Sequence, residues 1–171
     1  MNHETPFGNF MSTDTSKFVS MLLRLPLINR LGFAQKPREF VRFLKFATVG
    51  AFGMVVDLSV LTASREWLKL SLPLSVGLGF TVAVISNFTW NRLWTFPESR
   101  QRPLGNQLFQ FVLINVIGLG INELVVLGLH PVFARVLHDP PAYIAAKIIA
   151  IGIVLFWNYF VNRKWTYRGI D

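Results

Sequence analysis

The sequence predicts an all-α membrane protein with four transmembrane helices, arranged as two tandem two-helix repeats in parallel orientation. Three observations predict this fold. The composition is 52% hydrophobic with a positive mean hydropathy. Four apolar stretches approach or exceed the roughly 20 residues that cross a bilayer. A ten-residue motif occurs twice, each time after an apolar stretch. The chain of 171 residues is long enough for one such domain.

The first part of the chain is expected to be a cytoplasmic tail, residues 1–40, and residues 41–171 the transmembrane domain. Within residues 18–33, leucines alternate with Arg24 and Arg30, and Pro26 interrupts them. This pattern is typical of an amphipathic helix on the membrane surface, with its cations facing anionic lipid. A disordered tail is an equally good interpretation, because of the proline and the polar start.

The four spans are expected near residues 43–64, 72–91, 108–129 and 142–162. Basic residues alternate with them: seven Lys and Arg lie in residues 1–46, three in 91–107 and three in 162–171. By the positive-inside rule, both termini and the middle loop are cytoplasmic, as in a multi-pass protein of the bacterial inner membrane. The net charge of +8 then reflects topology and not a nucleic-acid partner.

An internal duplication explains the repeated motif Asn-x-x-x-Asn-Arg-x-Trp-Thr-Phe/Tyr, which occupies residues 87–96 and 158–167. The spans before it align too, with Phe46 matching Phe111, Gly53 matching Gly118 and Asp57 matching Asn122. Repeat 1 covers about 42–96 and repeat 2 about 107–167. The offset grows from 65 to 71, which predicts a loop about six residues longer in the second hairpin. Two spans per repeat give both halves one orientation, as in parallel-repeat transporters.

The motif supplies amide, guanidinium and indole groups at a membrane boundary. Amides four residues apart share a helix face, and they should face the bundle interior because an amide in lipid is costly. A guanidinium can bind phosphate with two hydrogen bonds, and an indole can lie against a sugar ring. Structural roles remain open: helix–helix hydrogen bonds, a positive-inside anchor and an interfacial belt. The candidate binding residues are Asn87, Asn91, Arg92, Trp94, Asn158, Asn162, Arg163 and Trp165.

Three ionisable residues lie deep inside the expected spans, namely Asp57, Glu123 and Lys147. Counted at 1.5 Å per residue, they reach a similar level toward the external side. Lys147 can therefore pair with Glu123 or Asp57, leaving one carboxylate protonated, hydrated or available to couple ion movement. A purely structural ion pair is the alternative interpretation.

Two further features are interpreted structurally. Lys45 lies near the cytoplasmic end of its span, where its side chain can extend to the interface. Small residues recur on the first and third spans, where they let helices pack closely; they include Gly50, Gly53, Gly118 and Gly120.

Catalytic and metal-binding constellations are not expected. The chain has no cysteine, and its three histidines are scattered without metal-ligand spacing. A nucleotide-binding glycine loop and a nucleophile with its base are also lacking from the sequence. We therefore expect a protein that binds and moves a ligand, with no enzyme activity, metal or cofactor.

Taken together, these residues resemble the GtrA-like family of small four-span membrane proteins. The resemblance covers about residues 40–168 and rests on Phe43-Leu-Lys-Phe-x-x-Val-Gly50, on Asp57 and on the two motif copies. It implies flipping of a polyprenyl-phosphate-linked monosaccharide, for example on undecaprenyl phosphate, to the outer leaflet. A membrane glycosyltransferase then uses the sugar to modify O-antigen or a related surface polysaccharide. The tail has no counterpart, and Asn115 stands where repeat 1 has Gly50.

Two other functions remain open. The protein could be a non-transporting anchor or partner of a glycosyltransferase. It could also be a proton-coupled exporter of small cations, with Asp57 or Glu123 as the binding carboxylate. Four helices enclose little interior, so a homo-oligomer would help to complete a transport path.

Overall fold

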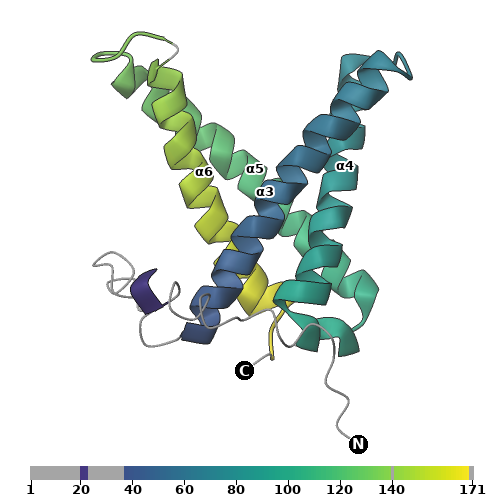
Figure 1. Cartoon of the computed structure of the whole chain (residues 1–171). Helices are drawn as coiled ribbons and strands as arrows, with labels where there is room; N and C mark the ends of the chain where they lie inside the picture. Colours follow the sequence, from purple (N-terminus) through teal and green to yellow (C-terminus); the bar gives the residue numbers. More distant parts are fainter. Residues whose placement is uncertain (1–19, 23–36, 140, 170–171) are drawn as a thin grey trace, which may run out of the picture. The chain divides into compact units, whose positions relative to one another are not determined.

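The computed structural model describes residues 20–22, 37–139 and 141–169 (Figure 1). The predicted surface helix over residues 18–33 lies outside these residues, apart from 20–22. In chain order the elements are the α-helix α3 (Pro37–Glu66), the α-helix α4 (Leu72–Trp90), the π-helical turn η2 (Asn91–Thr95), the 3-10 helix η3 (Pro97–Gln101), the α-helix α5 (Leu104–Phe133), the α-helix α6 (Pro141–Val161) and the π-helical turn η4 (Asn162–Thr166).

The chain divides into two compact units, Met1–Leu44 and Lys45–Asp171. In the first unit, Arg42 Nη1 forms an ion pair with Glu39 Oε1 at 2.8 Å, one turn apart at the start of α3. All contacts described below lie within the second unit.

Four of the described helical segments are long and apolar enough to cross a membrane: Pro37–Glu66, Leu72–Thr95, Leu104–Phe133 and Pro141–Thr166. The predicted fold class is therefore confirmed, and the protein is an all-α multi-pass membrane protein. The predicted limits 43–64 and 108–129 were too narrow, because the helices there extend to 30 residues each. The extra turns are the more polar ends, which hydropathy alone does not count as span.

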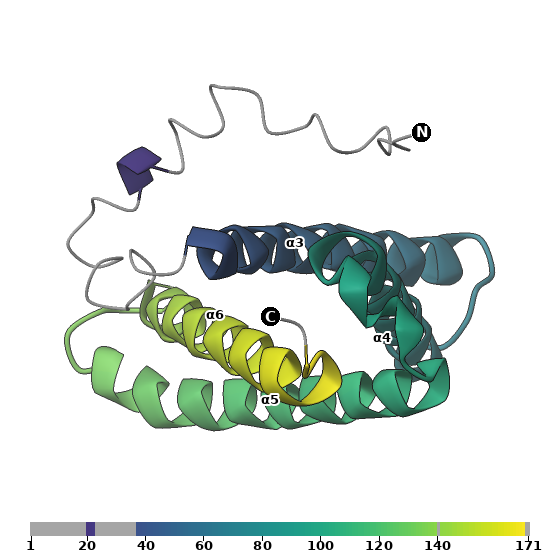
Figure 2. The same ribbon diagram turned by 90° about the horizontal axis from the view of Figure 1, so that it is seen from below.

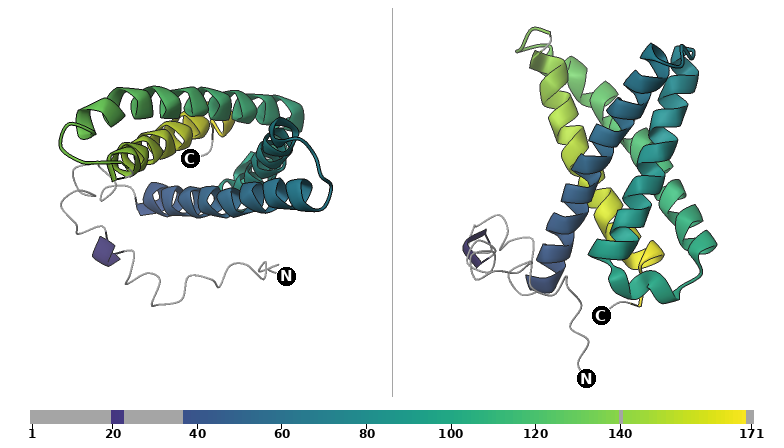
Figure 3. Two further views of the ribbon diagram at one scale, coloured as in Figure 1. Left: turned by 90° about the horizontal axis from the view of Figure 1, so that it is seen from above. Right: turned by 45° about the vertical axis from the view of Figure 1, so that its right-hand side comes forward.

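The helices of the second unit alternate in direction. The connections 67–71 and 134–140 lie at one end, which we call the hairpin end (Figures 1 and 3). The turns η2 and η4 and the segment 97–103 lie at the other, which we call the motif end. Helices α3 and α5 thus run in one direction, and α4 and α6 run back. This is the predicted topology, while the duplication itself stays a prediction.

The longer second connection was predicted only in part. Residues 134–140 connect α5 to α6 with seven residues, against five in 67–71. The other added residues lengthen helices: the span Pro141–Thr166 has 26 residues, against 24 in Leu72–Thr95. Polar or small residues at a helix end do not stop a helix whose backbone hydrogen bonds can continue.

Helices α5 and α6 lie side by side (Figure 2). Ala142, Ala146 and Ala150 recur every four residues on α6 and are fully buried. Small side chains at this spacing let two helices approach closely in a membrane. Near the motif end, Trp157 Nε1 of α6 donates to the carbonyl oxygen of Ile114 in α5 at 3.3 Å.

Candidate functional site

Both motif copies end their helix in a π-helical turn with the same hydrogen bonds. Asn91 Nδ2 donates to the Asn87 carbonyl oxygen at 2.9 Å, and Asn162 Nδ2 donates to that of Asn158 at 2.8 Å. The backbone N–H of the aromatic residue that follows each turn then donates to the Asn91 or the Asn162 carbonyl oxygen, each at 2.8 Å. π-Helical turns are rare and often lie at functional sites. The repeated sequence thus gives a repeated local structure.

Aromatic rings bring the two copies together. Phe96, which ends the first copy, stacks on Tyr167, which ends the second, with ring centroids 4.3 Å apart. Both side chains are fully buried. Stacked aromatic pairs of this kind add about 0.5–1.5 kcal/mol beyond the area they bury. Because Arg92 and Arg163 belong to these two copies, they lie at the same end of the helices, as predicted.

Arg92 holds the segment that joins α4 to α5. Its Nη2 donates to the Arg100 carbonyl oxygen at 2.8 Å and to that of Arg102 at 3.0 Å. Arg100 Nη2 donates in return to the Leu93 carbonyl oxygen at 2.6 Å. Part of the Arg92 guanidinium therefore serves this connection, a structural role that the sequence did not indicate.

The same segment binds the second motif copy. Arg102 Nη1 donates to the Thr166 carbonyl oxygen at 2.9 Å. Gln107 Nε2 donates to the carbonyl oxygens of Ser99 and Thr166, both at 3.3 Å. Gln107 is fully buried, and sequence reasoning missed it because a lone glutamine near a span end carries no motif.

The remaining motif cations and indoles lie nearer the surface. Arg163 Nη1 is 3.5 Å from the Tyr167 carbonyl oxygen. Trp94 and Trp165 are both partly exposed, at 37% and 39%. Lys45, which is expected to extend to the interface, places Nζ 5.3 Å from the Trp94 ring centroid and donates to the Trp94 carbonyl oxygen at 3.4 Å. A cation over an indole face is stabilised by the ring quadrupole, so Lys45 joins the candidate site.

Asn87 and Asn158 face glycines on the neighbouring helices. A Cβ atom added to Gly53 of α3 would overlap the Asn87 amide, and one added to Gly118 of α5 would lie 2.9 Å from Asn158 Oδ1. The two glycines therefore let the amides reach the helix–helix contacts, in keeping with the packing role expected for them. Gly50 and Gly120, by contrast, have nothing within 4 Å of such a Cβ.

Many polar atoms at the motif end are buried and have no hydrogen-bond partner among the described residues. They are the side-chain oxygens of Asn87, Asn91, Thr95, Ser99, Gln107, Gln110, Asn158 and Tyr167, and Nη1 of Arg92. We call these residues the polar layer. Natural proteins leave few buried polar atoms unpaired, and each one that remains calls for an explanation. The layer can supply both donors and acceptors to a polar ligand.

Tyr167 lies beside Arg92 in this layer. Burial raises the pKa of its hydroxyl from the ordinary value of 10.0, and the Arg92 guanidinium opposes the rise. The hydroxyl is therefore neutral at physiological pH and can act as a hydrogen-bond donor.

The intramembrane charges are arranged differently from the prediction. Lys147 Nζ of α6 donates to Asn122 Oδ1 of α5 at 2.7 Å. The ion pairs of the described residues do not include one between Lys147 and Glu123 or Asp57. Glu123 points away, since it follows Asn122 by one residue and lies on an exposed face of α5. Asp57 is half-buried and packs against Gly79 of α4.

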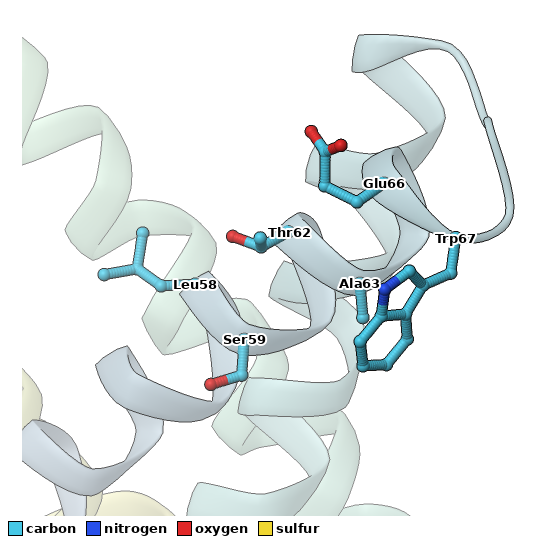
Figure 4. A pocket seen from close by; sticks show the side chains of 6 residues that line it. All are labelled: Leu58, Ser59, Thr62, Ala63, Glu66 and Trp67. Carbon is cyan, nitrogen blue, oxygen red and sulfur yellow. The ribbon is translucent and has the colours of Figure 1, made fainter.

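The hairpin end carries less polar structure. His130 Nε2 lies 2.9 Å from Asp139 Oδ1 on the exposed surface. Among the described residues, no group of three or more His, Cys, Asp or Glu could hold a metal ion. An open hollow of about 380 Å³ lies on one face of α3 (Figure 4), lined by Leu58, Ser59, Thr62, Ala63, Glu66 and Trp67. The hollow opens on the surface and shares no residue with the polar layer.

The fold and the site define a small multi-pass membrane protein with a buried polar layer at one end of its helices. The chain belongs to the family described as GtrA/DPMS, transmembrane domain, which matches residues 45–167. The family resemblance stated from the motifs is thereby confirmed.

Two relatives are similar over most of this chain. The dolichol-phosphate mannosyltransferase of Pyrococcus furiosus is 26% identical over 138 residues, which cover 75% of this chain and 34% of that protein. The membrane protein YngA of Bacillus subtilis is 24% identical over 123 residues, which cover 72% of this chain and 77% of that protein. The chain thus spans about a third of the mannosyltransferase and most of YngA.

Proposed function

We propose that this protein flips a polyprenyl-phosphate-linked monosaccharide from the cytoplasmic to the outer leaflet, for the modification of a surface polysaccharide. The observation that carries the proposal is the polar layer, in which both motif copies meet and buried amide and guanidinium groups lack partners. A phosphorylated sugar that crosses hydrocarbon loses its hydration, and fixed polar groups can replace that water. The name of the mannosyltransferase relative, which refers to dolichol phosphate, supports a ligand of this lipid class.

The binding step would use the chemistry of the motif. Arg92 keeps Nη1 unpaired and can donate to a phosphate oxygen, and Arg163 lies in the corresponding turn of the other copy. The amide oxygens of Asn87, Asn91 and Asn158 can accept hydrogen bonds from sugar hydroxyls. The isoprenoid chain would stay in lipid. Trp94 and Trp165, both partly exposed, can lie against the sugar or at the interface.

Lys147 would take the phosphate farther along the span. Asn122, a neutral amide, is its hydrogen-bond partner in the structure, so the ammonium charge has no carboxylate beside it among the described ion pairs. A charge at membrane depth is costly unless it is compensated. A passing phosphate would compensate the charge for as long as it remained there.

The orientation follows from the charges. We infer that the motif end faces the cytoplasm in a bacterial inner membrane, because the basic segments 91–107 and 162–169 belong to that end. The ligand would then be collected where it is synthesised, and membrane glycosyltransferases of the same pathway would use it on the far side. We expect no bond to be made or broken in this step.

The test is leaflet transfer in liposomes that contain the purified protein and a labelled polyprenyl-phosphate sugar. Arg92→Ala and Arg163→Ala should slow transfer, while Lys164→Ala, an exposed cation beside Arg163, serves as the matched control. Thermal stability of each variant separates loss of the ligand contact from loss of the 97–103 segment. If wild-type protein moves no lipid, or if both arginine variants transfer at the wild-type rate, the proposal is wrong.

A second function is favoured by one observation. The similarity to the mannosyltransferase covers only 34% of that longer protein, so a membrane domain of this kind occurs within a larger chain. The present protein could accordingly anchor a separate glycosyltransferase without moving lipid. Co-purification with such a partner, combined with no transfer in liposomes, would favour the anchor.

A further inference from the structure

The two motif copies differ in the hydrogen bond between their Asn and Thr side chains. In the second copy, Thr166 Oγ1 donates to Asn162 Oδ1 at 2.8 Å. In the first copy the corresponding atoms, Thr95 Oγ1 and Asn91 Oδ1, are both buried and have no partner. All four side chains are at most 2% exposed. The Asn–Thr pair of the second copy is therefore closed by its own hydrogen bond, while that of the first copy has unused hydrogen-bonding capacity.

The unused atoms specify the chemistry of a ligand. Asn91 Oδ1 can only accept, and the Thr95 hydroxyl can donate or accept. One hydroxyl group on a ligand can accept from Thr95 and donate to Asn91. Arg92 Nη1, on the same turn, is a charged donor without a partner, and it suits a phosphate oxygen. The three atoms together match a phosphorylated sugar.

The charges around the two copies also favour the first copy as the binding site. Lys45 lies over Trp94 of the first copy. The 65-residue offset that matches Phe46 with Phe111 places the neutral Gln110 at the corresponding position of the second repeat. Arg100 donates to the first copy and Arg102 to the second, so these two cations do not distinguish the copies. The further cation of the second copy, Lys164, is exposed, where water screens it. Lys45 is half-buried, so the first copy is the better site for an anion.

We propose that, of the two Asn–Thr pairs, only that of the first copy binds the phosphorylated sugar, with one hydroxyl between Asn91 and Thr95 and a phosphate oxygen on Arg92. The Asn–Thr pair of the second copy is a fixed support, closed by the bond between Thr166 and Asn162. This inference rests on the proposed function and states which copy of the site performs it. The three ligand-binding atoms are fully enclosed in this conformation, so the ligand enters when the first turn moves.

Two isosteric variants test the inference, Thr95→Val and Thr166→Val. Binding is measured by native mass spectrometry with three probes: a polyprenyl-phosphate hexose, polyprenyl phosphate without sugar, and free hexose phosphate. Thr95→Val should weaken binding of the sugar lipid about tenfold, the effect of one lost hydrogen bond in a buried site. It should change binding of the sugar-free lipid much less. Thr166→Val should bind as wild type but melt at a lower temperature, and Thr166→Ser should restore the melting temperature.

The three probes also separate the sources of the phosphate. Binding of the sugar lipid but not of free hexose phosphate means that the lipid chain contributes to affinity. Equal binding of both means that the head group alone is recognised. Each of these results supports the first-copy site as long as it depends on Thr95 and not on Thr166.

Thiol labelling gives a readout that needs no activity. The chain has no cysteine, so Thr95→Cys and Thr166→Cys each introduce a single thiol. A small charged methanethiosulfonate reagent should react faster at position 95 than at position 166. The sugar lipid should protect position 95 and leave position 166 unchanged.

The outcomes distinguish the inference from the function on which it rests. Equal loss of binding in the two valine variants, or normal binding in both, overturns the single-copy site while the flippase proposal stands. Faster labelling at position 166 does the same. If wild-type protein binds none of the three probes, both the inference and the proposed function are wrong.

Discussion

Replacing Gly53 by alanine should destabilise the protein through a single helix–helix contact. The added Cβ would meet all three terminal atoms of the Asn87 side chain. The Asn87 amide oxygen is buried, so the side chain can make room only by turning against the neighbouring helix. Overpacking of this kind costs roughly 1–3 kcal/mol. Alanine regains about 0.5–1 kcal/mol of helix propensity, so the net loss should be about 1–2 kcal/mol.

Gly50→Ala is the matched control on the same helix. Nothing lies within 4 Å of a Cβ at Gly50, so alanine there should leave stability unchanged or raise it by up to about 1 kcal/mol. Gly118→Ala should fall between the two, since its nearest atom, Asn158 Oδ1, lies 2.9 Å from the added Cβ. Thermal unfolding in detergent, followed by circular dichroism, measures all three. Equal stability of the Gly53 and Gly50 variants would refute the reasoning.

Three further predictions concern buried polar groups. Gln107→Ala should lower the free energy of unfolding by about 1–3 kcal/mol in the same assay, because two hydrogen bonds of about 0.5–1.5 kcal/mol each are lost, although both carbonyl oxygens keep a donor from Arg102. Asn122→Leu should destabilise by a similar amount by leaving Lys147 without its partner, and the double variant with Lys147→Met should recover the loss in a double-mutant cycle; additive losses would contradict this. The raised pKa of Tyr167 means that the folded state keeps a proton that the unfolded state releases above about pH 10. Its contribution is therefore fully present below pH 10 and falls as pH rises further, by up to about 1.36 kcal/mol per pH unit, and Tyr167→Phe should flatten the melting-temperature profile between pH 8 and 11.

The fold could be predicted from the sequence because two of its features, the apolar runs and the repeated motif, can be recognised without knowing which residues contact each other. Apolar runs of membrane length predict helices without knowledge of any partner, since the bilayer requires every backbone group to be paired within the segment. The motif repeated at residues 87–96 and 158–167 then predicted one orientation for both halves, and the turns η2 and η4 do lie at the same end. The ends of the helices were less predictable, because polar residues extend a helix that hydropathy ends early.

The site was predicted less well, because the sequence does not show in which direction a side chain points or which distant residue it contacts. Depth counting placed Lys147 level with Asp57 and Glu123, yet it gives no rotation about the helix axis. One residue of difference turns a side chain by about 100°, so Asn122 faces Lys147 and Glu123 does not. The bond from Arg92 to the 97–103 segment depends on a 3-10 helix that has no hydropathy signal. The contact of Lys45 with Trp94 was not predicted, because the two residues lie 49 positions apart in the chain.

The aromatic contacts are the same in the two repeats, whereas the hydrogen bonds of the polar side chains differ between them. Phe46 packs on Tyr159 with ring centroids 5.6 Å apart, and the matched pair, Phe111 and Phe88, has the same separation. Self-complementary pairs of this kind are what a two-fold relation between two copies produces. These two aromatic pairs, which we call the apolar frame, can hold both turns in place even though the polar residues of the two turns make different hydrogen bonds. Substitutions in the frame, such as Phe111→Leu, should therefore lower stability and affect both copies together. Substitution of Thr95 in the first turn, whose hydroxyl has no partner, should change ligand binding and leave stability nearly intact.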